Sequence, residues 1–240
     1  MNEKIVDIAP LIKQTNDGLS VEERTALEKG LVEKLEALRA LPVDKKSDSK
    51  TLLQRVRLQL DVAENLNALD RKMEAWSIAY EAFHIALDQE SWQDAVEACN
   101  VLFQTSLVDA LAALGMGIWL SVTFPVNPEL TMAMLVHVVD ETPDNSDGAA
   151  LAAITARYVV DLRADDEQHE NLSFFADNLI AMVAKRHSKV QDQEGMNKWL
   201  DKLALRDPQV FLPRLGKVVD VLVEGKWWFD RDALRSKLPN

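Results

Sequence analysis

The chain has 240 residues, of which 48% are apolar and 28% are charged, a composition that excludes global disorder and allows a substantial core in one or two domains. Its formal net charge of −12 argues against nucleic-acid binding, because an acidic surface repels phosphates. The only cysteine, Cys99, excludes an intramolecular disulfide, and the four scattered histidines give no zinc-ligand pattern. Few glycines and prolines, eight of each, favour long helices over many strands and turns.

The start of the chain carries no targeting pattern. Residues 1–11 contain charges at Glu3, Lys4 and Asp7 and no uninterrupted apolar stretch. We therefore expect no secretory signal and a cytoplasmic location. Because the cytosol is reducing, this location agrees with the use of a single cysteine.

The first predicted helix begins after Ser20. Ser20 and Glu23 have the spacing of a capping box, in which each side chain accepts a hydrogen bond from the backbone of the other residue. An amphipathic pattern continues from there to about Leu41, before Pro42. The polar run over residues 44–50 then predicts a linker or a long loop.

Helix starts recur after this linker at intervals of 16 to 20 residues. Two starts, Asn127–Pro128 and Asp207–Pro208, place a capping residue before a proline, whose missing N–H costs no helical hydrogen bond there. Evenly spaced helices joined by short turns predict an all-α fold of stacked antiparallel helix hairpins. The starts are predicted near Thr51, Arg71, Ser91, Leu107, Asn127, Asp147 and Asp166.

These elements suggest three parts. We predict an N-terminal helical segment and linker over residues 1–47, a helical-repeat-like core over residues 48–191, and a C-terminal helical cap over residues 192–240. One continuous domain could also contain all three, because the chain length allows either arrangement.

The segment AYEAFHIALDQESWQDAVEACNVLF, residues 79–103, places small and aromatic residues at helical spacing. Ala79, Ala82 and Ala86 follow one predicted helix, and Trp92 begins the next. Over about residues 69–103 this pattern resembles the tetratricopeptide repeat family, although the Leu-Gly pair and the repeat-ending proline of that family are absent. The resemblance implies a helical array that binds peptides or protein segments on a concave face.

The loop Glu141-Thr142-Pro143-Asp144-Asn145 carries a second resemblance. It is similar to the Glu-Pro-x-Asp-His loop of the all-α chaperones that assemble redox enzymes and bind their leader peptides. Here Thr142 is inserted before the proline, and Asn145 replaces the histidine. This resemblance implies an assembly-chaperone role, and the same composition is also common in plain turns.

A charge-free run of 17 positions covers residues 110–126 and approaches the length that spans a membrane. Asp109 borders it, Pro125 stands near its end, and no second apolar run accompanies it. We therefore predict a buried central helix and no membrane segment.

Charge is unevenly distributed along the chain. Residues 1–70 hold 11 basic and 13 acidic groups, residues 71–195 hold 7 and 20, and residues 196–240 hold 9 and 6. The net charges are therefore −2, −13 and +3. We interpret the acidic middle as a solvated face, which could also attract a basic protein or peptide.

Glu81 and His84 have the i, i+3 spacing with which di-iron carboxylate bundles present two metal ligands on one helix face. Such a site needs a second pair on another helix, and the nearest candidate is Asp166 with His169. A chance spacing at a helix edge is the other interpretation.

Two further side chains carry chemistry. His137 lies in an apolar stretch followed by Asp140 and Glu141, where a carboxylate–histidine pair could titrate near neutrality, but no nucleophile accompanies it. A histidine in such a stretch is usually a hydrogen-bonded core residue or a half-buried one. Cys99 lies on an alanine-rich helix face, which is typical of a small core residue.

The C-terminal region contains three consecutive aromatic residues, Trp227, Trp228 and Phe229, before a short helix predicted over residues 231–238 with Asp230 as its cap. Three adjacent aromatic side chains cannot all face one side of a helix or strand. They either pack on the chain's own helices as a cap, or contact a partner or second subunit, and we predict all three as partner-binding residues.

The sequence therefore favours a non-enzymatic adaptor, scaffold or assembly chaperone that binds another protein or peptide. It predicts no catalytic residue, metal, cofactor, nucleic acid or membrane contact, and it leaves a homo-oligomer open. One alternative is a helical metal-binding or enzyme domain that uses Glu81 and His84. The other is a structural subunit of a larger complex.

Overall fold

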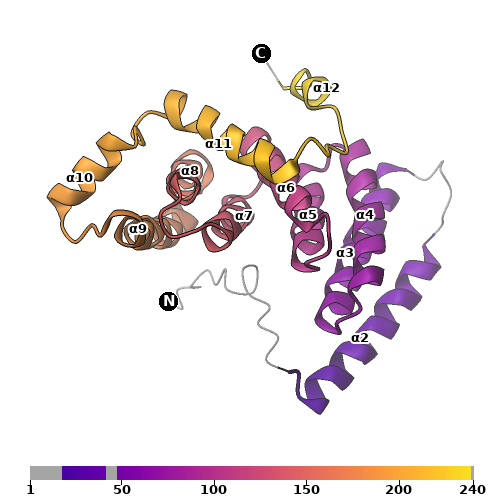
Figure 1. The fold of residues 1–240 in the computed structure, drawn as a ribbon. Coiled ribbons are helices and arrows are strands. Elements are labelled where there is room, and N and C mark those ends of the chain that lie inside the picture. The colour runs from indigo at the N-terminus through magenta and orange to yellow at the C-terminus, as the bar shows by residue number, and fades with distance from the viewer. Residues whose placement is uncertain (1–17, 42–47, 239–240) are drawn as a thin grey trace. The chain divides into compact units, whose positions relative to one another are not determined.

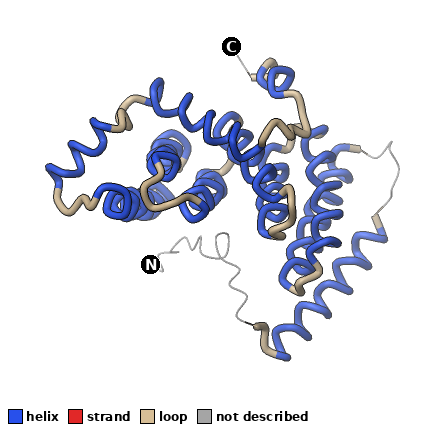
Figure 2. Tube along the Cα trace, viewed as in Figure 1, coloured by secondary structure: helices blue, strands red, loops and turns tan. Residues whose placement is uncertain are grey.

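The computed structural model describes residues 18–41 and 48–238, so the expectations for residues 1–11 and 44–47 lie outside the described residues. Within the described ranges all regular structure is helical and no strand occurs (Figures 1 and 2). The predicted all-α class is therefore confirmed, and helices that follow one another in the chain pack against each other.

Eleven helices make up the described part of the chain. Their starts agree with the seven predicted after the linker to within three residues. The C-terminal helix is shorter than predicted, because it ends at Arg235 and Leu238 lies outside it. The helices are α2 (Val21–Ala40), α3 (Ser49–Ala68), α4 (Lys72–Asp88), α5 (Trp92–Gln104), α6 (Ala110–Thr123), α7 (Pro128–Glu141), α8 (Asp147–Arg163), α9 (Asp166–Ser188), α10 (Gln193–Lys202), α11 (Pro208–Val223) and α12 (Arg231–Arg235).

The first two helices begin at side-chain caps. The Ser20 hydroxyl accepts a hydrogen bond from the Glu23 N–H at 3.2 Å, and the Glu23 carboxylate accepts one from the Ser20 N–H at 2.9 Å, so the predicted capping box is confirmed. α3 starts two residues earlier than expected because the Asp48 carboxylate caps it, accepting from the Thr51 N–H at 2.8 Å. Each cap satisfies a backbone donor that the first helical turn leaves unpaired.

Both predicted proline starts are confirmed. The Asn127 side chain accepts a hydrogen bond from the Glu129 N–H at 2.7 Å, with Pro128 at the first helical position of α7. Asp207 caps α11 in the same way before Pro208. Proline fits this position because its fixed φ is helical and its missing N–H has no partner there.

The described residues divide into two compact units. The first contains α2 to α6 together with α12, and the second contains α7 to α11 over residues 125–225. We refer to them as the α2–α6 unit and the α7–α11 unit. The three-part division expected from the sequence stays a prediction, because a grouping by contacts does not define which segments fold independently.

In the α2–α6 unit, consecutive helices pack on each other and α3 also contacts α5. The alanines expected to allow close packing, Ala79, Ala82 and Ala86, are fully buried in α4. α6 is buried on nearly all sides, which explains why the run from Ala110 carries no charge. The predicted buried central helix is therefore confirmed, and among the described helices none is long and apolar enough to cross a membrane.

In the α7–α11 unit, α8 packs between α7 and α9, and α11 also lies against α8. Arginines hold the ends of helices to neighbouring backbone: Arg186 donates to the Val139 carbonyl at 2.6 Å, and Arg163 donates to the Val126 carbonyl at 3.4 Å. α10 contacts α9 across the short connection between them. α9 is thus fixed along one face by its neighbours.

Candidate protein-docking face

Trp228, the middle residue of the C-terminal aromatic group, packs against α4 of its own unit. Its ring contacts Tyr80 at 4.9 Å, Phe83 at 5.4 Å and Trp76 at 6.1 Å between centroids, all edge to face. Because such contacts favour aromatic pairs beyond their burial, they fix this segment on the helices. The sequence-based expectation of packing on the chain's own body therefore holds for Trp228.

Trp227 and Phe229, the residues on either side of Trp228 in the sequence, pack against α6. Trp227 and Phe229 contact Trp119 at 6.1 Å and 5.5 Å, and the Arg231 guanidinium covers the Trp227 ring at 4.1 Å from its centroid. All three aromatic residues of the segment stay half-buried. Their predicted role in binding a partner remains a prediction, while their packing role within the unit is visible.

Glu81 and His84 do not act as a pair, because each of them contacts other side chains. Glu81 lies 3.7 Å from the Arg55 guanidinium, and the His84 ring packs against Tyr80 and Phe83 at 4.6 Å and 5.2 Å. Burial lowers the pKa of His84, although Asp88 nearby opposes this. No group of three His, Cys, Asp or Glu side chains in the described part of the chain is arranged to hold a metal ion.

His137 and Cys99 are core residues. His137 is 4% exposed, and burial lowers its pKa to about 4, so the ring is neutral at neutral pH. Asp140 and Glu141 are exposed at the end of α7. Cys99 is completely buried, and this burial raises the pKa of its thiol well above the ordinary value, which makes the thiolate inaccessible.

The structure brings together one constellation that the sequence did not indicate. His187 Nε2 lies 3.2 Å from Asp147 Oδ1, and His187 Nδ1 lies 2.6 Å from the Ser188 hydroxyl. Trp199 Nε1 also donates to the same Nδ1 at 3.2 Å, and Arg214 donates to the other Asp147 oxygen at 3.1 Å. These residues come from α8, α9, α10 and α11, so no local spacing could reveal them.

This arrangement resembles a Ser–His–Asp triad in composition only. Indole N–H is a donor and never an acceptor, so His187 Nδ1 is an acceptor toward Trp199 and the Ser188 hydroxyl at the same time. The single lone pair of Nδ1 is therefore shared, whereas a nucleophilic triad needs a base that serves the serine alone. The constellation therefore fastens four helices to one another.

Three large apolar side chains are exposed on the outer side of α9. Phe174 is 71% exposed, and Met182 and Phe175 are 47% and 37% exposed. The opposite side of α9 is core, built from Leu172, Ala176, Leu179, Ile180, Val183 and Ala184. We call the exposed positions Phe174, Phe175, Ala181 and Met182 the α9 face.

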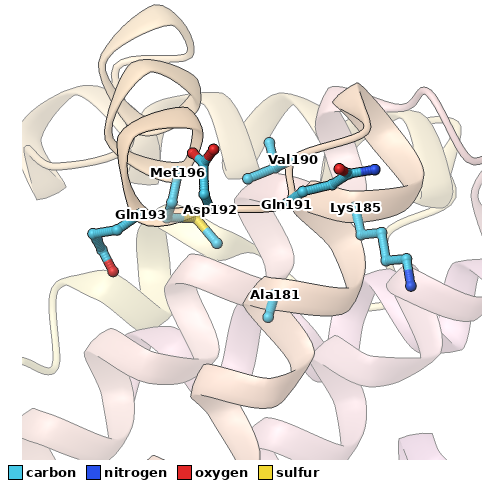
Figure 3. Close-up of a pocket in the computed structure, with 7 residues that line it drawn as sticks. All are labelled: Ala181, Lys185, Val190, Gln191, Asp192, Gln193 and Met196. Carbon is cyan, nitrogen blue, oxygen red and sulfur yellow. The ribbon is translucent and has the colours of Figure 1, made fainter.

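The α9 face continues into a hollow at the junction of α9 and α10 (Figure 3). The hollow has a volume of about 530 Å³. Ala181 belongs to both the face and the hollow, and Val190 and Met196 add apolar surface to the hollow. Polar groups complete its lining: Lys185, Gln191, Asp192 and Gln193.

Acidic residues border the α9 face. Asp166, Glu167 and Glu170 are exposed on the N-terminal half of the helix, whereas Lys185 lies at the C-terminal end. Over residues 128–188, which cover α7 to α9, there are 11 acidic and 4 basic side chains. Acidic groups therefore predominate at the N-terminal end of the α9 face, and Lys185 lies at its other end.

Sequence reasoning missed the α9 face, although one signal was present. Phe174 and Phe175 are adjacent, and two adjacent side chains on a helix are about 100° apart, so both cannot point into one narrow core.

Comparison of the chain with protein-family models, with curated proteins and with solved structures gives no match.

Proposed function

We propose that the protein is a non-enzymatic cytoplasmic adaptor that binds another protein through the α9 face. The observation that carries the proposal is the exposure of three large apolar side chains on one helix, Phe174 at 71%, Met182 at 47% and Phe175 at 37%, whereas the other side of this helix is packed. Large apolar side chains grouped on a surface mark interaction sites, and aromatic residues dominate binding energy at such sites.

Two sequence resemblances support the same class of function. The tetratricopeptide-like pattern over residues 69–103 and the chaperone-like loop from Glu141 to Asn145 both belong, in the families they resemble, to proteins that bind peptides. An assembly chaperone is the form of adaptor that the loop favours. The Glu81–His84 alternative gains no specific support, because both side chains already have other contacts.

The test is site-specific photo-crosslinking in cells of the native source. A benzophenone amino acid placed at Phe174 is expected to crosslink to a specific protein, whereas the same group at Val221, which is 72% exposed on α11, is not. The captured protein is then purified and titrated against the wild type and the Phe174→Ala/Met182→Ala variant. Removing two apolar anchors should weaken binding by roughly 30-fold or more.

Two results would overturn the proposal: no specific crosslink from position 174, or equal affinity of the captured protein for wild type and variant. A third probe at Trp227 examines the predicted C-terminal contact in the same experiment. A crosslink there but none at position 174 would move the binding site to the C-terminal aromatic group.

A further inference from the structure

The α9 face has the geometry of a helix-binding strip. Phe174, Asn178, Ala181 and Lys185 follow each other at intervals of four and three residues and so share one line of the helix. Phe175 and Met182 are seven residues apart on one edge of this line, which corresponds to about 10 Å along the axis. A second helix presents side chains on one of its faces every seven residues, so its spacing matches that of Phe175 and Met182.

An extended peptide has no strand edge to pair with here. Interior backbone N–H and C=O groups of a helix are already paired along the helix, so α9 offers no edge to which a strand could add. A helical partner satisfies its own backbone hydrogen bonds internally. It needs only apolar side chains that contact Phe174 and Met182, and one further side chain that enters the hollow.

The hollow gives the strip a defined end. Ala181 of α9 and Met196 of α10 line it, and Val190 lines it from the connection between these two helices (Figure 3). A volume of about 530 Å³ is large enough for one long or aromatic side chain of a partner. Asp192 on its lining accepts a hydrogen bond from the Gly195 N–H at 2.7 Å, which fixes this carboxylate in place.

The charges select the sign of the partner and its direction. Asp166, Glu167 and Glu170 precede Phe174 at the N-terminal end of the strip, so a partner needs basic side chains there. Lys185 stands at the other end, where a basic group would be repelled. A partner helix therefore carries its positive charge at the end that meets the start of α9.

The same charges disfavour two other occupants. A second copy of this chain whose α9 ran parallel to this one would bring its own acidic border against this border, and in the antiparallel arrangement each strip offers only Lys185 to the three carboxylates. An anionic lipid surface would be repelled by the same carboxylates. Neither objection applies to a basic helix.

On these grounds, and resting on the proposed function, we infer that the α9 face binds a basic amphipathic helix of a partner protein, with one of its large apolar side chains in the hollow between α9 and α10. The partner class is thus a helix with apolar residues at i, i+3, i+4 and i+7 and lysine or arginine on its flanks.

The probe is a synthetic helical peptide of about 18 residues with leucines at these positions and lysines on the flanks, titrated against the full chain by calorimetry. Two comparison peptides are its glutamate-for-lysine version and a scrambled version of equal charge. The basic amphipathic peptide is expected to bind about tenfold or more tightly than either. Phe174→Ala/Met182→Ala should weaken it by a similar factor, and Val221→Ala should not.

Charge-reversal variants distinguish binding at the α9 face from a general attraction of the basic peptide to the acidic chain. Glu167→Lys/Glu170→Lys is expected to weaken the basic peptide, and Lys185→Glu to strengthen it. The matched control is Glu33→Lys/Glu36→Lys, which changes the net charge equally at exposed positions of α2 and should have a smaller effect. Equal loss in both double variants, or equal binding of the scrambled peptide, would overturn the inference.

Three further outcomes also overturn it. These are a dimer of the protein alone that depends on Phe174, binding to phosphatidylserine vesicles that depends on Phe174, and a partner segment crosslinked at position 174 that is not basic and helical. In this last case the adaptor proposal stands while the inference fails. Absence of any crosslink at position 174 rejects the adaptor proposal itself.

Discussion

At the scale of single residues, the buried imidazole of His137 links stability to pH. Its ordinary pKa of 6.5 falls to about 4 because burial on α7 disfavours the charged ring. Between these values the unfolded chain binds a proton that the folded chain does not. Stability therefore rises with pH across this window and decreases as pH falls through it.

We expect the free energy of unfolding to fall by about 2 kcal/mol from pH 7 to pH 5 on account of His137 alone. Urea titrations of the wild type and His137→Gln at both pH values give the measurement. Glu64 and Glu97, whose pKa values burial raises, act in the opposite direction, but their effect is common to both proteins and cancels in the difference. Equal losses in the two proteins would contradict the prediction.

At the scale of helices, several ends adopt the left-handed conformation without glycine. Ala204, which follows α10, has a φ of 50°, and Lys189 after α9 has a φ of 57°. A Cβ in this region is crowded by the neighbouring carbonyl, and only glycine avoids the cost. The chain therefore stores a small strain at these positions.

Replacing Ala204 by glycine should stabilise the protein by about 1 kcal/mol, because the exposed methyl group makes little contact and its strain is released. Thermal or urea unfolding measures the change. The matched control is Ala37→Gly, an exposed position inside α2, where the same replacement should cost about 1 kcal/mol. A loss of stability in Ala204→Gly would show that the left-handed end is not strained.

The sequence could predict where several helices begin, but not where they end. Helix starts were predictable because Ser20, Asn127 and Asp207 are specific capping residues with a local mechanism. The left-handed positions Asp70, Glu90 and Ser106 carry no such signal, since glycine is the residue that usually marks a helix end there. α12 was predicted too long although its end is right-handed, at Ser236 with a φ of −62°, because no glycine marks this helix end either.

Long-range features were beyond local reasoning. The contact of Trp228 with Trp76 and Phe83 joins residues more than a hundred positions apart, and the Asp147–His187–Trp199 cluster joins three helices. Composition and spacing describe neighbours on one helix only. The exposure of Phe174 likewise depends on which side of α9 meets α8, a fact that only tertiary packing decides.

At the scale of the whole molecule, the α2–α6 unit is completed by a segment that returns from the far end of the sequence. Lys226 pairs with Asp109 at 3.0 Å, Lys237 pairs with Glu90 at 2.8 Å, and the intervening aromatic residues pack on α4 and α6. Exposed ion pairs contribute little, so the aromatic contacts supply most of the stabilisation.

Removing residues 226–240 should therefore loosen the α2–α6 unit and leave the α7–α11 unit unchanged, because the removed segment contacts α4 and α6 while α7 to α9 pack on their own core. Hydrogen exchange read by mass spectrometry should show reduced protection in α4 and α6 and wild-type protection in α7 to α9. Trp228→Ala, which uncovers Phe83, should reproduce the effect at about 2 kcal/mol or more. Equal loss of protection in both units would mean that they unfold together, and unchanged protection everywhere would mean that the aromatic segment is held for a partner and stabilises nothing of its own.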